Sequence, residues 1–159
     1  MVLAEIGHQE LARSMKNNIF SLAWGTVAQG DEWDVPPPVD LSAESLIAEV
    51  GRTKELVKEY VVQDENGAIE VGNQKWNIST TPTKYLYLKF VFSQSQNSGD
   101  DIYQAGLFIN TVPVPGKENE TYLLPSDVQE PGKMLFIENM RVIHRNDVTK
   151  EIFEYIITF

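Results

Sequence analysis

The amino-acid sequence predicts an α+β protein in which N-terminal helices pack on a mostly antiparallel sheet or a small β-sandwich. Helix-like segments occur before residue 60, and alternating, strand-like segments dominate after it, separated by turns rich in Gly and Pro. A length of 159 residues suits one domain and is hardly enough for two. We therefore expect a single domain over residues 1–159. It would consist of a helix and strand (1–26), an extended Pro-rich acidic arm (27–40), and a helix with a β-rich core (41–159).

The first helix and strand are expected within residues 1–26. Residues 8–18 contain neither Gly nor Pro, and Leu11 and Met15 are spaced to form one narrow apolar stripe on a helix. The apolar run Ile19–Trp24 then predicts a strand.

An extended arm follows. It contains three acidic residues around Trp33, followed by Pro36, Pro37 and Pro38. Three consecutive prolines fix φ and remove three hydrogen-bond donors, which favours polyproline II and prevents a helix or a central strand. We expect a rigid surface arm with an aromatic side chain beside it.

A second helix is expected after the arm. Asp40 or Ser42 can cap it, and apolar residues recur at helical spacing up to residue 57. Gly51 weakens the middle of this helix by roughly 1 kcal/mol relative to Ala. Near Glu59 the helix is expected to end, because β-branched residues follow.

The remaining chain is predicted to be mostly β. Asn66-Gly67 indicates a hairpin between the strands 60–64 and 68–71. The segment 84–92 alternates so that its even positions from Leu86 to Phe92 are apolar. Further strands are expected at 102–110, where Gly106 indicates a bulge or a close backbone approach, at 134–142 and at 151–159.

Composition excludes several functions. There is no cysteine, which rules out disulfides, thiol catalysis and Cys-bound metals. The net charge of −10 argues against nucleic-acid or anionic-membrane partners. The first residues lack a basic n-region, so we expect a cytosolic chain without a cleaved segment.

Candidate sites for chemistry are weak. His144 could be oriented by Asp147, but no nucleophile elbow or nucleotide-binding loop accompanies it. The acids of the arm are best explained as a solvated loop rather than as a cation site. We therefore expect no catalytic residues, no cofactor and no metal.

Interaction is the more promising role, although each candidate has a structural alternative. Trp33 beside the prolines is either a contact surface or a ring packed on its own arm. Arg141 and Arg145 are either a small cationic spot or a solvated pair. The C-terminal strand is either an open edge or a buried central strand. The candidate interaction residues are Trp33, Pro36, Pro37, Pro38, Arg141, Arg145, Ile157 and Phe159.

The order of several short stretches resembles structural proteins from the tail and baseplate of tailed bacteriophages. These stretches are Leu22–Thr26, Trp33 with Pro36–Pro38, Glu49–Arg52, Pro82–Phe90, Gln104–Thr111, Pro131–Glu138 and Phe153–Phe159. The resemblance spans about residues 19–159. It implies a non-enzymatic virion component, present in several copies and bound to other phage tail or baseplate proteins. A receptor- or glycan-binding module that stacks sugars on Trp33 and Trp76 is the alternative, and a carboxylate-dependent cell-wall hydrolase is a further one.

Overall fold

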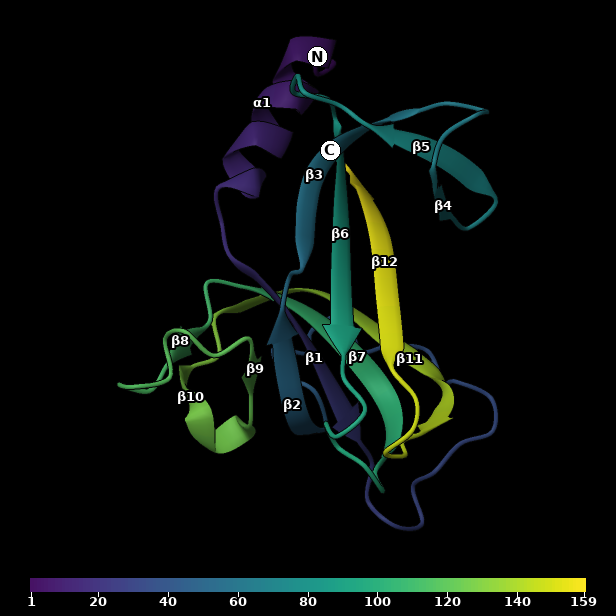
Figure 1. Cartoon of the computed structure of the whole chain (residues 1–159), viewed down its shortest axis with the longest axis vertical. Helices are drawn as coiled ribbons and strands as arrows, with labels where there is room; N and C mark the ends of the chain where they lie inside the picture. Colours follow the sequence, from purple (N-terminus) through teal and green to yellow (C-terminus); the bar gives the residue numbers. More distant parts are fainter. The chain divides into compact units, whose positions relative to one another are not determined.

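The structure is a computed structural model that describes all 159 residues (Figure 1). Strands make up 46% of the chain and helices 9%. The prediction of an α+β fold with N-terminal helices is therefore wrong: the protein is mostly β and has one α-helix, α1 (Glu5–Lys16).

The chain divides into two compact units, each built on its own five-stranded sheet. The first unit contains residues 1–18, 55–90 and 152–159, and the second contains residues 19–54 and 91–151. The expectation of one folding domain over residues 1–159 stays a prediction.

The first unit contains α1 and a sheet with the strand order β12-β6-β3-β5-β4. Its strands are β3 (Val57–Gln63), β4 (Ile69–Val71), β5 (Gln74–Ile78), β6 (Tyr85–Phe92) and β12 (Glu151–Thr158). The last two residues of β6 and the first residue of β12 belong to the second unit.

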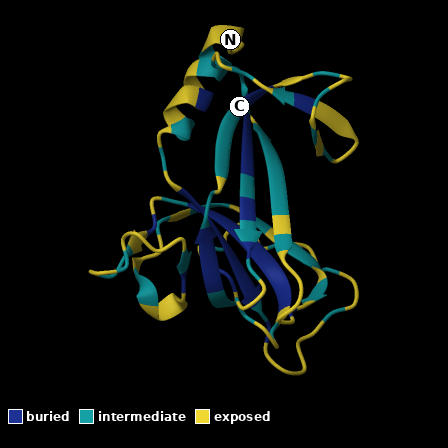
Figure 2. Ribbon diagram, in the orientation of Figure 1, coloured by how far each residue is buried: buried dark blue, intermediate teal, exposed yellow.

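Strand β6 is the core of the first unit. Leu86, Leu88 and Phe90 are completely buried, as the alternation predicts (Figure 2). The opposite face of β6 is only partly covered. Tyr87 packs in a cluster with Val61 and Trp76, whereas Tyr85, Lys89 and Val91 are partly exposed.

The second unit contains a sheet with the strand order β11-β7-β1-β2-β9 and a two-stranded pair, β8 with β10. Its elements are β1 (Phe20–Thr26), β2 (Ala48–Lys54), β7 (Asp101–Ile109), β8 (Val112–Pro113), β9 (Tyr122–Leu123), η1 (Pro125–Asp127), β10 (Val128–Glu130) and β11 (Lys133–His144).

The second predicted helix, over residues 41–59, is replaced by turns and by strands β2 and β3. Asp40 does not cap a helix. Its carboxylate accepts hydrogen bonds from the backbone N–H (2.8 Å) and the hydroxyl (2.6 Å) of Ser42, which closes a turn. Beyond the turn, β2 pairs antiparallel with β1, with Arg52 opposite Ala23. Tertiary strand pairing therefore overrides the helical spacing of the apolar residues.

A buried arginine fixes β2 in the second unit. The guanidinium of Arg52, 1% exposed, binds both carboxylate oxygens of Glu49 at 2.7 and 2.6 Å. It also donates 2.7 Å hydrogen bonds to the Thr111 hydroxyl and to the carbonyl of Pro131, and it lies over the Phe108 ring. One side chain thus joins β2 to the segment after β7 and to the turn before β11.

A second network surrounds Asn97, which adopts a positive φ of 53°. Its side-chain oxygen accepts hydrogen bonds from Trp24 Nε1 (2.7 Å) and from the Tyr122 hydroxyl, while its amide donates to the Val50 carbonyl (3.0 Å). Gly51 is required here, because a Cβ at this position would lie 2.6 Å from the Tyr122 ring. Burial raises the pKa of the Tyr122 hydroxyl to about 12.

We predict that Arg52→Ala lowers the free energy of unfolding by about 3–5 kcal/mol, because it leaves the half-buried Glu49 carboxylate without its partner. The matched control is Arg13→Ala, which removes an ion pair between Arg13 and Glu10 whose side chains are about half exposed, and should cost less than about 1 kcal/mol. Urea unfolding of both variants measures the difference. Equal losses would show that the buried guanidinium has no special role.

A second prediction concerns alkaline pH. Because the folded-state pKa of Tyr122 lies above its unfolded value, this group stabilises the fold fully below pH ~10, and the contribution is lost as pH rises from ~10 towards ~12. Tyr122→Phe lacks this contribution, so its free energy of unfolding should fall less steeply over that interval. Denaturant titrations at stepwise pH provide the test, and parallel profiles for the two proteins would contradict it.

Candidate assembly surface

The connection between β1 and β2, residues 27–47, is unusually long. The two strands are antiparallel neighbours, which loops of two to five residues usually join. We call residues 27–47 the β1–β2 connection. It includes the predicted arm, and loops of this length in a compact domain usually serve a function.

Trp33 attaches the first half of the connection to the sheet. Its indole Nε1 donates a 2.8 Å hydrogen bond to the carbonyl of Met140 on β11. Its ring meets Tyr103 of β7 edge-on, with 5.2 Å between ring centroids. Trp33 is therefore half-buried against β7 and β11, and part of the ring surface remains exposed.

A chain of amide hydrogen bonds attaches the prolines. Asn139 of β11 donates its amide to the carbonyls of Pro37 (3.0 Å) and Pro38 (3.4 Å). Its own oxygen accepts a 2.7 Å bond from Gln104, whose side-chain oxygen in turn accepts a 2.8 Å bond from the N–H of Ile47. The middle and the end of the connection are thus joined through two side chains.

Leu46 forms the third attachment. It is 6% exposed and packs against Ala23 and Phe108. Gly106 makes room for it, because a Cβ there would lie 2.9 Å from a Leu46 methyl carbon. The sequence predicts a bulge or a close backbone approach at Gly106, whereas the close neighbours in the structure are the side chains of Leu46, Phe108 and Met134. No local sequence pattern marks Leu46 as one of them.

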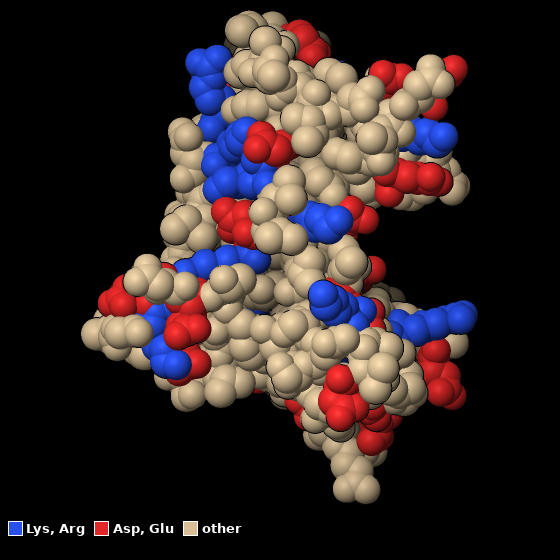
Figure 3. All heavy atoms as spheres, in the orientation of Figure 1, with Lys and Arg blue, Asp and Glu red and all other residues tan.

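Between these attachments the connection exposes acidic and apolar side chains. Its five acids, with no Lys or Arg, are Asp31, Glu32, Asp34, Asp40 and Glu44. Val35 is 76% exposed and Leu41 is 90% exposed. In Figure 3, acidic atoms gather at the lower right, where the connection lies in Figure 1.

The charges on the connection affect neighbouring groups. Burial raises the pKa of the Tyr103 hydroxyl, and the negative charges of Asp101, Glu32 and Asp34 raise it further. The Ser42 hydroxyl and N–H hold the pKa of the Asp40 carboxyl below its usual value. The surface is therefore anionic at neutral pH.

The structure separates the two predicted arginines. Arg141 on β11 is exposed. Arg145 has a completely buried side chain that donates to the carbonyls of Ser93 (2.8 Å) and Thr149 (3.1 Å) and lies 5.0 Å from the centroid of the Trp24 ring. The pair does not form an exposed cationic spot.

The other aromatic and terminal candidates also have defined places. Trp76 of β5 is 4% exposed and packs edge-on against Tyr85, so it offers no open face on which a sugar could stack. Ile157 and Phe159 are half-buried residues in and just after β12, which is an edge strand of its sheet.

The histidine that the sequence marks as a candidate for chemistry bonds to a neighbouring strand. His144 Nδ1 lies 2.6 Å from a carboxylate oxygen of Asp101, its partner on the neighbouring strand, rather than against Asp147. No group of three or more potential metal ligands is present. No helix has both the length and the apolar character needed to cross a membrane.

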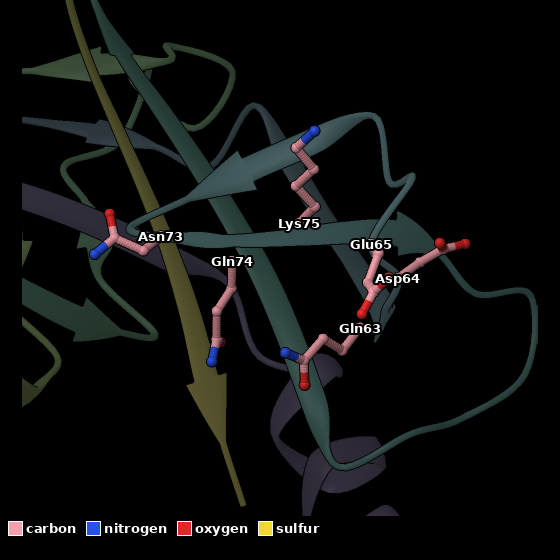
Figure 4. A pocket seen from close by; sticks show the side chains of 6 residues that line it. All are labelled: Gln63, Asp64, Glu65, Asn73, Gln74 and Lys75. Carbon is pink, nitrogen blue, oxygen red and sulfur yellow. The ribbon is translucent and has the colours of Figure 1, made fainter.

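An open depression of about 290 Å³ lies in the first unit beside the hairpin of β4 and β5 (Figure 4). It is lined by Gln63, Asp64, Glu65, Asn73, Gln74 and Lys75. Figure 4 shows Gln63 and Gln74 pointing to one side and Lys75 to the other. Asp64 already binds the Asn77 amide (2.7 Å) and the N–H of Asn66 (2.9 Å), so its carboxylate serves the turn.

We predict that Asn139→Ala loosens the connection more than the sheet, because it removes the bonds to Pro37 and Pro38 and leaves the Gln104 amide without its acceptor. The expected loss in the free energy of unfolding is about 1–3 kcal/mol. Cleavage by a Glu-specific protease after Glu32 and Glu44 should accelerate. Asn73→Ala, an exposed asparagine in the first unit, is the control. Unchanged cleavage of Asn139→Ala would contradict the attachment.

Comparison with known protein families identifies one match over almost the whole chain. Residues 2–159 match the family model described as "Baseplate wedge 3 tail fiber network component". Among curated proteins, no sequence matches the chain. The family match covers nearly the whole chain, and it confirms the resemblance to phage tail and baseplate proteins. The chain therefore belongs to the baseplate wedge 3 tail fiber network component family, and it is a structural protein of the bacteriophage tail baseplate.

Proposed function

We propose that the chain is a non-enzymatic part of the baseplate that is present in several copies per particle and works through contacts with other tail or baseplate proteins. The observation that carries this proposal is the β1–β2 connection. It is attached to the sheet at Trp33, at Pro37 and Pro38, and at Leu46, yet it exposes five acids and three large apolar side chains, those of Val35, Leu41 and Ile47.

The attachments reduce the cost of binding. A flexible loop loses conformational entropy when a partner orders it, whereas a segment that is already attached loses less. The prolines restrict the backbone further, because each fixes its own φ. Trp33, Pro36, Pro37 and Pro38 would thus act mainly by holding the exposed side chains in position.

The charge of the connection indicates the kind of partner surface. Five acids without a compensating base repel other acidic surfaces and attract basic ones. Val35 and Leu41 offer apolar contacts beside these charges. The expected partner is a baseplate or tail protein with a basic surface that surrounds an apolar patch. Arg141 lies on the strand that holds the connection and remains a candidate contact, whereas Arg145 would support the surface from within.

The same features support the rest of the proposal. A net charge of −10 disfavours contacts with nucleic acid and with anionic lipid. The imidazole of His144 is paired with the Asp101 carboxylate on the neighbouring strand, a contact that joins the two strands. We propose synthesis in the host cytoplasm followed by incorporation into the virion tail, with no cofactor.

The test is to neutralise three exposed acids of the connection in the phage, with Asp31→Asn, Asp34→Asn and Glu44→Gln combined. Incorporation into purified particles, measured by quantitative mass spectrometry, should fall about tenfold or more, which corresponds to about 1.4 kcal/mol of contact energy. The control combines Glu65→Gln, Glu70→Gln and Glu120→Gln, three exposed acids outside the connection, and should be incorporated normally.

The readouts separate the parts of the proposal. The melting temperatures of the two free variants should agree with that of the parent, which excludes misfolding as the cause. Normal incorporation of the connection variant would overturn the assigned contact surface. A stoichiometry of one chain per particle would overturn the multi-copy role.

A further inference from the structure

Strand β12 is an edge of the first unit's sheet, with β6 as its only neighbouring strand. Two contacts show how it lies on β6. The N–H of Phe159 donates a 2.9 Å hydrogen bond to the carbonyl of Lys84, and Lys89 Nζ lies 3.3 Å from a Glu154 carboxylate oxygen. Both contacts fit one antiparallel register, in which Phe159 is opposite Lys84 and Glu154 is opposite Lys89.

This register determines which backbone groups of β12 remain open. In an antiparallel pair, alternate residues direct both N–H and C=O towards the partner strand. Phe159 is directed towards β6, and so are Phe153, Tyr155 and Ile157. The outward residues are therefore Ile152, Glu154, Ile156 and Thr158. Their backbone groups point away from β6, on the side where the sheet has no further strand.

Natural edges are protected against strand addition by charged side chains, Pro or a bulge, or they are very short. The charge in the middle of this edge is that of Glu154, which is paired with Lys89. Residues 151–159 contain no Pro, Gly, Lys or Arg, and most of them are β-branched or aromatic. Ile152 is 53% exposed. Such a segment favours pairing with another strand through main-chain hydrogen bonds.

We propose that this edge pairs with β12 of a second copy of the chain, antiparallel and about a two-fold axis at Tyr155. In that register the four outward residues pair with one another: Ile152 lies opposite Thr158, and Glu154 lies opposite Ile156. The strand is thus complementary to itself over its full length. The inference deepens the proposed multi-copy role by naming one of the partners.

The charges favour antiparallel over parallel pairing of the two copies. Antiparallel pairing at Tyr155 places Glu154 opposite Ile156 and leaves the two Glu154 side chains as diagonal neighbours, each paired with its own Lys89. A parallel, in-register pair would instead align Glu154 with Glu154. Because the arrangement is two-fold symmetric, it uses the edge of both copies and closes as a dimer rather than continuing as a fibre.

Hydrogen exchange of the free chain at increasing concentration provides the test. Exchange at the amides of Ile152, Glu154, Ile156 and Thr158 should slow as the protein dimerises, in step with the dimer fraction from sedimentation velocity. The amides of Phe153, Tyr155 and Ile157, which bond to β6, should be slow at every concentration. This alternation would not result from general burial of the strand.

Proline substitutions give the matched variants. Ile152→Pro and Thr158→Pro each remove an outward N–H and spare the bonds to β6, so each should raise the dimer dissociation constant about tenfold or more. Ile152→Ala and Thr158→Ala keep the N–H and should dimerise more tightly than the proline variants. Far-UV circular dichroism checks that all four fold.

Several results would overturn the pairing. One is a chain that stays monomeric at the highest concentration with the four outward amides unprotected. Another is protection of these amides only after another baseplate protein is added, which would assign the edge to a different chain. Neither result would change the loss of incorporation expected when the acids of the β1–β2 connection are neutralised. The proposed strand pairing can therefore fail while the proposed contact surface on the connection holds.

Discussion

The buried guanidinium of Arg52 is the interaction on which much of the second unit depends. It satisfies Glu49 on its own strand and reaches the Thr111 hydroxyl and the Pro131 carbonyl, which belong to segments far away in the sequence. The turn at Pro131 leads directly into β11. That strand supplies the Met140 carbonyl and the Asn139 amide that hold the β1–β2 connection. The position of an exposed, acidic surface is thus linked to a single buried cation.

Buried polar side chains of this protein donate hydrogen bonds to backbone carbonyls as well as forming pairs with opposite charges. Arg145 lies among the carbonyls of Ser93, Gln96 and Thr149, and Asn97 bonds the Val50 carbonyl. Irregular segments leave such carbonyls without strand partners, and a buried carbonyl without a donor is costly. Charged and amide side chains therefore stabilise the loops that connect these short strands. This explains how a chain with so much irregular structure keeps defined loops.

Sequence patterns predicted the regular strands well, because alternation of apolar and polar residues along a strand follows directly from the burial of one face. Strand β6, strand β7 with its tight Gly106, and the terminal strand β12 are found close to their expected bounds. The prediction of a helix over residues 41–59 was wrong, because its apolar spacing also suits a strand. The register of that strand is set by pairing with β1, which is distant in the sequence. The prediction of a hairpin at Asn66-Gly67 was also wrong, because the strands on either side of this turn do not pair with each other. That turn exists, but β3 pairs with β5, and the two-residue hairpin is the one between β4 and β5 at Gly72-Asn73.

The candidate surface was only partly predictable for the same reason. Trp33 and the prolines mark the connection in the sequence, since an aromatic beside consecutive prolines is unusual. Their partners Asn139 and Gln104 could not be predicted, because the neighbouring sequence does not distinguish a buried amide side chain from an exposed one. Arg145 shows the converse case, in which a conspicuous charge in the sequence belongs to the interior of the fold.

The amide chain from Ile47 through Gln104 and Asn139 to Pro37 has a consequence for variation among related phages. It fastens both ends of residues 39–45 to the sheet, so this stretch forms a closed loop with fixed ends. Lengthening a loop between fixed ends costs little, since closure entropy grows only with the logarithm of length. Residues 39–45 could therefore be exchanged or extended without disturbing the strands. The baseplate would then acquire a different neighbour through an insertion in one loop, with its framework unchanged.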